Sequence, residues 1–187
     1  MAEVQHDPQF SRRQFVGFGI ATLATLTPLS ALASAPDVNE RALAFQHLHT
    51  GESVKTVYWT RSGYIPEALK DINFILRDFR TDDIKAIDPG LLDFLFAMRR
   101  RLGTARPFEV ISAYRSPRTN SALAQNSRGV AQNSLHMRGQ AVDVRISGVG
   151  TRSLARLAQQ LQAGGVGYYP RSNFVHVDVG RVRSWGI

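Results

Sequence analysis

The first clear alternation of apolar and polar positions covers residues 41–49, RALAFQHLH. A two-residue period places successive side chains on opposite faces of a strand, so this segment is predicted to form a half-buried strand. Residues 50–52, TGE, suit a turn, and residues 53–60, SVKTVYWT, are rich in β-branched and aromatic side chains. Together the three segments predict a β-hairpin.

A helical period replaces the alternation in longer segments. Residues 66–80 and 90–102 repeat apolar side chains at the three- and four-residue spacing of a helix that covers a core. Asp88 suits the N-cap of the second helix, and Gly103 suits its end. We expect Thr151 to cap a further helix with the same periodicity.

Short apolar strands alternate with these helices in the C-terminal part of the chain. In residues 140–146 the alternation places Asp143 on the face away from the valines, and in residues 174–179 it places His176 and Asp178 on one face. Two further strands are expected at 108–112 and 166–169. This order of elements predicts an α+β fold, a single domain with a central antiparallel sheet flanked by helices.

The N-terminal segment has the pattern of an export signal. A twin arginine in SRRQF, residues 11–15, precedes an apolar run rich in glycine and alanine that ends at Ala33. Alanines at 31 and 33 fit an A-x-A cleavage site. We therefore expect a twin-arginine export signal at 1–33 and a mature domain at 34–187, with an uncleaved membrane anchor as the alternative. Such export predicts a periplasmic protein with no stable membrane insertion after cleavage.

Composition narrows the partners and the chemistry. The net charge of +8 predicts an anionic partner, and peptidoglycan is one such polymer, whereas no nucleic-acid-binding motif accompanies the arginines. There is no cysteine, which excludes disulfides, thiolate metal sites and a cysteine nucleophile. Any metal ion must therefore be held by His, Asp or Glu.

Three residues form a candidate metal site. SLHMRGQAVD, residues 134–143, places His136 and Asp143 seven positions apart, and FVHVD, residues 174–178, adds His176. Two imidazoles and a carboxylate suit one Zn²⁺ per chain and leave a position open for water. Zinc lowers the pKa of such a water to about 7, which makes hydroxide available to attack an amide carbonyl.

Two further residues are candidates for the catalytic machinery. Arg115 lies in a polar loop after the 108–112 strand, where its guanidinium could bind a substrate carboxylate or support an oxyanion, or simply tie the loop to backbone carbonyls. Asp178 could act as the general base, or it could orient His176 as a supporting carboxylate. A second histidine pair, His47 and His49, shares one face near the hairpin turn, where a metal role competes with ordinary packing.

These motifs also resemble a known family. S-x-H-x-x-G-x-A-x-D followed by F-V-H-V-D, with S-A-Y-R-S upstream, resembles the zinc peptidases of the D-Ala-D-Ala carboxypeptidase and VanX superfamily, whose fold is shared by the hedgehog signalling domain. The stretch at 43–52, LAFQHLHTGE, together with the export signal, is similar to the YcbK-type murein endopeptidases. The resemblance implies that His136, Asp143 and His176 bind zinc and that Arg115 contacts the substrate or the transition state.

The same resemblance implies an exported metallopeptidase that hydrolyses cross-links between peptidoglycan stem peptides, with a preference for bonds between meso-diaminopimelate residues. One departure concerns the general base. Many relatives carry Glu or Asp three residues before the last histidine, whereas this chain has Asn173. Two alternatives therefore stay open: a non-catalytic, metal-containing wall-binding module, and a D,D- or L,D-carboxypeptidase.

Overall fold

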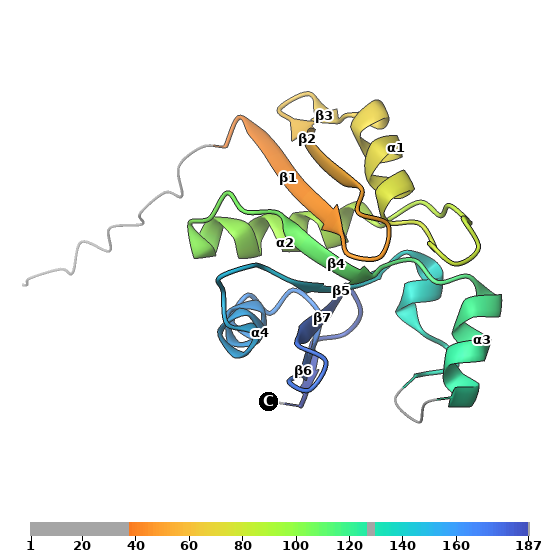
Figure 1. Cartoon of the computed structure of the whole chain (residues 1–187). Coiled ribbons are helices and arrows are strands. Elements are labelled where there is room, and N and C mark those ends of the chain that lie inside the picture. The colour runs from red at the N-terminus through yellow and green to blue at the C-terminus, as the bar shows by residue number, and fades with distance from the viewer. Residues whose placement is uncertain (1–37, 127–129, 187) are drawn as a thin grey trace, which may run out of the picture. The chain divides into compact units, whose positions relative to one another are not determined.

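A computed structural model describes residues 38–126 and 130–186, in which eight strands form one sheet (Figure 1). The strand order is β3-β2-β1-β4-β5-β7-β6-β8. The pairs β1–β4 and β6–β8 are parallel, and the other neighbours are antiparallel, so the sheet is mixed. The strands are β1 Glu40–His47, β2 Ser53–Thr60, β3 Gly63–Tyr64, β4 Phe108–Ser112, β5 Ala141–Arg145, β6 Gly165–Tyr169, β7 Phe174–Asp178 and β8 Arg183–Trp185.

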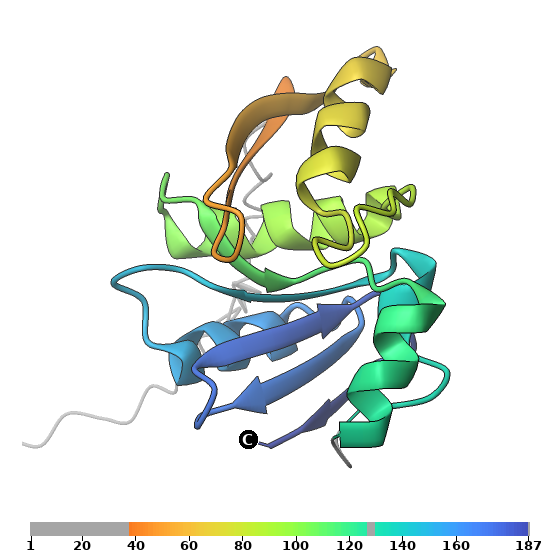
Figure 2. The same ribbon diagram turned by 45° about the vertical axis from the view of Figure 1, so that its right-hand side comes forward.

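Helices pack along this sheet. α1 lies on β2, α2 lies on β1, and α4 lies on β6 and β7 (Figure 2). The α+β, single-domain prediction is therefore confirmed. The helices are α1 Pro66–Ile75, α2 Pro89–Leu102, α3 Pro117–Asn126, the 3₁₀ helix η1 Leu135–Arg138 and α4 Thr151–Gln160.

The hydrophobic core lies between the helices and one face of the central strands. Val142 of β5 belongs to one buried cluster with Leu95 of α2 and Leu154 of α4. Successive side chains of a strand point to opposite faces. Asp143 of β5 and His176 of β7 therefore point away from this apolar layer, to the face on which polar chemistry is possible.

Several predicted features are confirmed. β1 and β2 form the expected hairpin, closed by a hydrogen bond from the backbone N–H of Gly51 to the carbonyl of His47. Asp88 caps α2, because its Oδ1 accepts a hydrogen bond from the N–H of Gly90 at 2.9 Å. Gly103 ends the same helix with a φ of 62°, a left-handed conformation that glycine adopts without steric cost.

α1 ends at Ile75, five residues before the predicted end, for a tertiary reason. The fully buried carboxylate of Asp78 accepts hydrogen bonds from the N–H and hydroxyl of Ser116, at 2.8 and 2.7 Å. A buried carboxylate needs such donors, and they lie on the loop after β4. The chain therefore leaves the helix before Asp78 although its apolar spacing continues.

Other differences arise at the ends of elements. Thr151 is the first residue of α4 and not its N-cap, which is Gly150. The Thr151 hydroxyl instead contacts Oδ1 of Asn173 at 3.2 Å. The strands β3 and β8 were not predicted, because two or three residues are too few to show a period.

None of the helices among the described residues is long and apolar enough to cross a bilayer. The predicted export signal at 1–33 lies outside the described residues, and its division from a mature domain at 34–187 stays a prediction.

Candidate metal centre

The 3₁₀ helix η1 sets the orientation of His136. The hydroxyl of Ser134 accepts a hydrogen bond from the N–H of His136, and Gly139 ends the helix with a φ of 68°. A Cβ at Gly139 would collide with the carbonyl oxygen of Ala86, so only glycine fits this turn. The Nδ1–H of the His136 ring donates to the carbonyl of Ala113 at 2.6 Å, which leaves Nε2 to face the site.

The register of the sheet brings the other two candidates together. Asp143 of β5 lies directly opposite His176 of β7 in their antiparallel pair. Both side chains are buried, with 4% and 9% of their surface exposed. Each of the residues His136, Asp143 and His176 offers one donor atom, and the three atoms lie within 4.8 Å of one another. The structure thus brings together all three predicted ligands.

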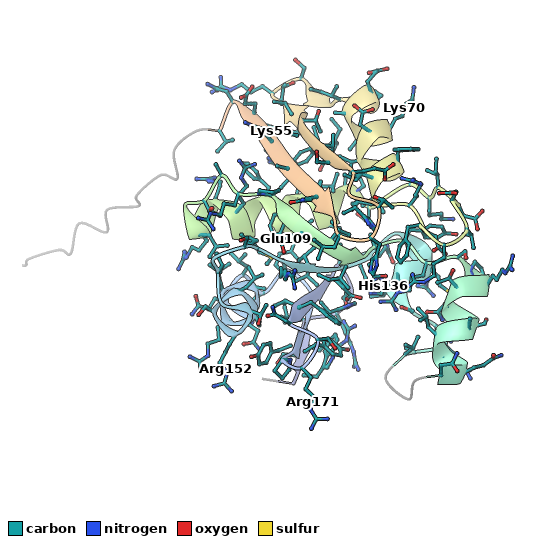
Figure 3. All side chains as sticks on the ribbon, in the orientation of Figure 1. Lys55, Lys70, Glu109, His136, Arg152 and Arg171 are labelled. Atoms are coloured by element: carbon teal, nitrogen blue, oxygen red, sulfur yellow. The ribbon has the colours of Figure 1, made fainter. Side chains whose placement is uncertain are left out.

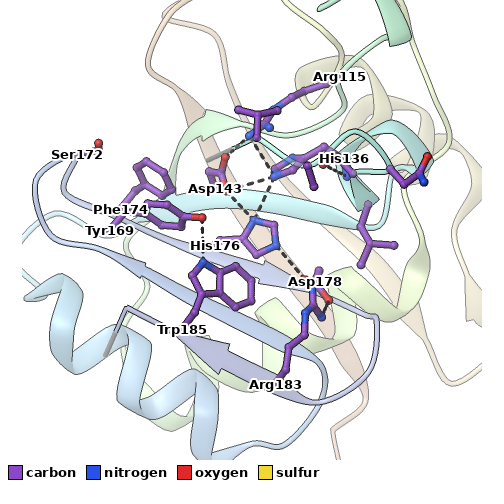
Figure 4. Close-up of a pocket in the computed structure, with 15 residues that line it drawn as sticks. Arg115, His136, Asp143, Tyr169, Ser172, Phe174, His176, Asp178, Arg183 and Trp185 are labelled. Atoms are coloured by element: carbon purple, nitrogen blue, oxygen red, sulfur yellow. Dashed lines mark hydrogen bonds and ion pairs between the residues drawn. The ribbon is translucent and has the colours of Figure 1, made fainter. Parts of the chain in front are cut away.

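Three atoms that carry lone pairs converge at this point (Figure 4). Nε2 of His136 lies 3.1 Å from Nδ1 of His176 and 3.3 Å from Oδ1 of Asp143. Nδ1 of His176 lies 2.9 Å from the same Oδ1. Facing acceptors repel one another unless a proton or a metal cation lies between them, so the arrangement favours a cation.

Asp178 lies behind His176 rather than in front of it. Its Oδ2 accepts from Nε2–H of His176 at 2.9 Å, on the side of the ring that faces away from Asp143. Arg183 donates to both oxygens of Asp178, at 3.0 and 2.7 Å, and the N–H groups of Gly180 and Gly165 also donate to this carboxylate. The carboxylate is fully buried and surrounded by donors, which is the geometry of a group that orients a ligand.

The pKa values of the buried groups follow from these contacts. Burial by itself would raise the pKa of Asp143, but the charges and hydrogen bonds of His136 and His176 outweigh it and hold the pKa well below its usual range. Burial lowers the pKa of His136, and the nearby Asp143 only partly opposes this. Asp143 is therefore ionised and His136 neutral, as ligands must be.

The electrostatics around His176 favour positive charge. Burial would lower the pKa of His176, but hydrogen bonds with Asp143 and Asp178 raise it to about 8. Asp178 itself is buried, yet its hydrogen bonds with His176 and Arg183 hold its pKa well below the usual range. Two ionised carboxylates thus flank one imidazole, and the same field would stabilise a metal cation at Nδ1.

Arg115 reaches the centre from the loop after β4. Its Nη2 donates to Oδ2 of Asp143 at 2.5 Å and lies 3.2 Å from Nε2 of His136. Its Nε donates to the hydroxyl of Ser112 at 2.9 Å, which fixes the plane of the guanidinium. Arg115 is one of the residues that line the cleft, and no hydrogen bond from its Nη1 is seen among the described residues, so this nitrogen could bind an anionic group of a ligand.

The centre opens into a cleft of about 350 Å³. One wall is aromatic: the rings of Tyr169 and Phe174 stack at 4.6 Å, and Nε1 of Trp185 donates to the Tyr169 hydroxyl at 2.9 Å. The Trp185 ring lies 5.2 Å from the His176 ring. Trp185 therefore flanks the cleft.

Carboxylates are scarce in this cleft. Among the described residues that line it, Asp143 and Asp178 are the only acidic side chains, and both are engaged as above. Asn173, three residues before His176, lies in the β6–β7 turn and lines a different cavity, with Glu109 and Arg145. The described residues therefore provide no further carboxylate that could act as a base.

The second histidine pair lies apart from the candidate metal centre. His47 is buried and its Nδ1 accepts from the N–H groups of His49 and Thr50, at 3.2 and 3.4 Å. The His49 ring stacks on Phe79 at 4.3 Å. Among the described residues, the one group of three or more potential metal-binding side chains is the His136 centre, so this pair caps a turn and packs.

Sequence reasoning missed two residues that support the centre. Arg183 holds Asp178, and Ser112 holds Arg115. Ser112 stands in the S-A-Y-R-S motif, but no role was predicted for it, and Arg183 lies on the unpredicted strand β8. Only its two-residue spacing from Trp185 on a strand could have indicated that both side chains share a face.

Known proteins resemble this chain over almost its whole length. The family described as peptidoglycan L,D-endopeptidase MepK matches residues 35–185. The chain belongs to this family. The peptidoglycan L,D-endopeptidase MepK of Escherichia coli (strain K12) is 45% identical over 176 residues, which cover 94% of this chain and 97% of that protein. The probable peptidoglycan L,D-endopeptidase MepK of Haemophilus influenzae is 40% identical over 168 residues, or 89% and 90% of the two chains. Membership in the MepK family confirms the predicted resemblance to murein endopeptidases.

Proposed function

We propose that this protein is a zinc-dependent peptidoglycan endopeptidase that cuts L,D peptide cross-links between stem peptides. The observation that carries the proposal is the buried convergence of His136, Asp143 and His176 at the floor of an open cleft. Family membership supports the substrate class, since the relatives are named for L,D-endopeptidase activity on peptidoglycan. Bonds between meso-diaminopimelate residues are the proposed target.

The donor set fits zinc. Nitrogen and oxygen donors without thiolate, in a three-residue set beside an open cleft, are the composition of catalytic rather than structural zinc sites. Nε2 of His136, Nδ1 of His176 and a carboxylate oxygen of Asp143 would hold the ion. Zinc in such a site supplies Lewis-acid chemistry and lowers the pKa of a water ligand to about 7.

The remaining residues position these groups and the substrate. The Ala113 carbonyl and Asp178 each hold a ring nitrogen–hydrogen of a histidine and so set its tautomer. Nη1 of Arg115 is available to bind a stem-peptide carboxylate or the developing negative charge on the scissile carbonyl oxygen. The aromatic wall beside Trp185 excludes water from one side of the cleft. Asp178 is proposed as a positioning carboxylate.

Export through the twin-arginine pathway and action in the periplasm complete the proposal. They rest on the SRRQF segment at 11–15 and on the substrate class, because cross-linked peptidoglycan lies outside the cytoplasm.

One observation favours a second candidate, a metal-containing module that binds the wall without cutting it. That observation is the absence of a free carboxylate among the described residues of the cleft, together with Asn173 at the position of the relatives' acid.

A muropeptide digest separates the two functions. Purified protein, stripped with a chelator and reloaded with one equivalent of zinc, is incubated with purified peptidoglycan, and the products are separated by chromatography. The endopeptidase predicts new monomeric muropeptides that appear only after reloading. Stoichiometric zinc binding without any product from L,D- or D,D-cross-linked substrates would instead establish the binding module.

A further inference from the structure

Charge is divided unequally between two parts of the described fold. Residues 38–93 contain nine Asp and Glu against seven Lys and Arg, whereas the described residues 94–126 and 130–186 contain three acidic residues against thirteen arginines. The first part supplies β1–β3 and the second supplies β4–β8. Because the sheet order keeps these two sets of strands at opposite ends, the division along the sequence becomes a division in space.

The acidic residues of the second part are not available to neutralise its surface. Glu109 pairs with Arg145 at 2.6 Å, Asp143 lies in the metal centre, and Asp178 is buried between His176 and Arg183. Nine arginines in this part are exposed, and none of them forms an ion pair with another described residue: Arg100, Arg101, Arg106, Arg118, Arg138, Arg152, Arg156, Arg171 and Arg181. We call these nine side chains the arginine surface.

Three members of the arginine surface lie next to residues of the cleft along the chain. Arg171 adjoins Ser172, Arg138 lies two residues after His136, and Arg181 lies two residues before Arg183; Ser172, His136 and Arg183 all line the cleft. Figure 3 shows Arg152 and Arg171 at the end of the molecule away from Lys55 and Lys70.

We propose that the arginine surface docks the enzyme on the carboxylates of polymeric peptidoglycan, outside the cleft itself. The inference rests on the proposed function for the identity of the polymer. A field of one sign next to an active site raises the local concentration of an oppositely charged substrate. The cleft holds one cross-link, whereas the surrounding arginines contact stem peptides on either side of it.

Exposed apolar residues argue for a hydrated polymer rather than a membrane. Among the described residues, four of the five exposed large hydrophobic side chains, Leu48, Tyr64, Phe74 and Ile84, belong to residues 38–93, and only Val182 lies in the arginine-rich part. Interfacial membrane binding needs apolar side chains next to the basic ones.

Co-sedimentation with insoluble peptidoglycan sacculi tests the proposal. The triple variant Arg152→Glu, Arg156→Glu, Arg171→Glu is compared with a control of equal charge change, Lys55→Glu, Lys70→Glu, Lys85→Glu; all six side chains are exposed. We expect the arginine triple to weaken binding at least about tenfold and the lysine control less than about twofold. Melting temperatures verify that both variants are folded.

Three further arms complete the test. Wild-type binding should fall as salt rises from 0.1 to 1 M, because the Debye length shrinks from about 10 to about 3 Å. Sacculi whose carboxylates have been converted to neutral methylamides should no longer retain the protein. Turnover of a small soluble cross-linked muropeptide should be unchanged in both triples, while digestion of sacculi falls only in the arginine triple. If neither the wild type nor any variant has turnover, the proposed function fails. The sedimentation experiment still tests the docking proposal, because it measures binding and not hydrolysis.

Equal losses in the two triples would overturn the proposal, since net charge and not its location would then control binding. Retention of amidated sacculi would overturn it as well. So would an arginine triple that loses binding to phosphatidylglycerol vesicles but keeps binding to sacculi, because the surface would then be a membrane contact.

Discussion

The two histidine pairs of this molecule have different surroundings. His136 and His176 lie on different elements, 40 residues apart, and converge with Asp143. His47 and His49 lie two residues apart beside a turn and face Phe79. The difference is the second contact: in the first pair the Ala113 carbonyl and the Asp178 carboxylate each occupy one ring nitrogen and direct the other to a shared point. The contact at one ring nitrogen therefore decides whether the other nitrogen of a histidine is available to a metal ion.

The largest contrast is expected from deletion of one member of each pair. His136→Ala removes a donor atom and should abolish zinc binding at stoichiometric concentration. Peptidoglycan hydrolysis should fall by more than about 100-fold, which is more than the loss expected when only a contact that supports a ligand is removed. His49→Ala should retain one zinc per chain and full hydrolysis. Metal content by mass spectrometry and a muropeptide digest measure both. Zinc retained by His136→Ala would place the ion elsewhere.

An arginine lies beside each histidine pair, and the two arginines allow the same comparison. Arg115 contacts Asp143, and Arg77 contacts Glu52 in the hairpin turn at 2.9 Å. If Arg115 binds the substrate, Arg115→Ala should lower kcat/KM by about 100- to 1000-fold. Arg115→Lys should recover part of this loss, because lysine keeps the positive charge but cannot donate two parallel hydrogen bonds as a guanidinium does. Arg77→Ala should leave kcat/KM within about twofold. Steady-state kinetics on a soluble cross-linked muropeptide decide between a substrate-binding role and a structural one.

A variant of Asp178 distinguishes a carboxylate that orients His176 from one that transfers a proton. As a positioning carboxylate, Asp178→Asn should weaken zinc binding by about 10- to 100-fold, and excess zinc should restore most of kcat. A general base would show the reverse, with kcat lost and zinc affinity intact. Competition with a chromogenic chelator gives the affinity, and hydrolysis at saturating zinc gives kcat.

The smallest effect concerns the acid stability of the hairpin. Burial, and then the nearby His49, lower the pKa of His47, so the folded state binds its proton less readily than the unfolded chain. Stability from this residue is therefore lost as pH falls through and below its unfolded pKa of about 6.5. In His47→Asn the amide oxygen can replace Nδ1 as acceptor for the turn.

The His47→Asn variant should cost about 1–2 kcal/mol at pH 7.5 from lost packing and show a flatter decline between pH 7 and 5. Urea unfolding at several pH values measures both. His49→Asn, at an exposed position, is the control and should change stability by less than about 0.5 kcal/mol. An unchanged acid slope in His47→Asn would assign the pH dependence to other groups.

Periodicity was enough to orient two of the three candidate ligands but not the residues that support them. The alternation in β5 and β7 put Asp143 and His176 on the correct faces, because a half-buried strand has only two ways to point a side chain. The end of α1 could not be read in the same way, since it depends on the contact between Asp78 and Ser116 across 38 residues. Arg183 was missed for a different reason, because its three-residue strand is too short to show a period.

The position of Asn173 shows a different limit. Asn173, three positions before His176, has a φ of 52° in the β6–β7 turn, and its side chain contacts Thr151. Three is an odd number, so on an extended strand this position and His176 point to opposite faces. The side chain of a residue in a left-handed turn can point to either face of the sheet, so its spacing from His176 does not predict the face.

The narrow fit between Gly167 and Trp185 makes the cleft observable by spectroscopy. A Cβ at Gly167 would collide with the indole ring, so the glycine is what allows Trp185 to lie against β6, 5.2 Å from His176. The chain has one other tryptophan, Trp59, which packs under Arg41 on β2. In a Trp59→Phe background, indole emission therefore comes from a single ring beside the centre, and a zinc titration should change its intensity without any added dye.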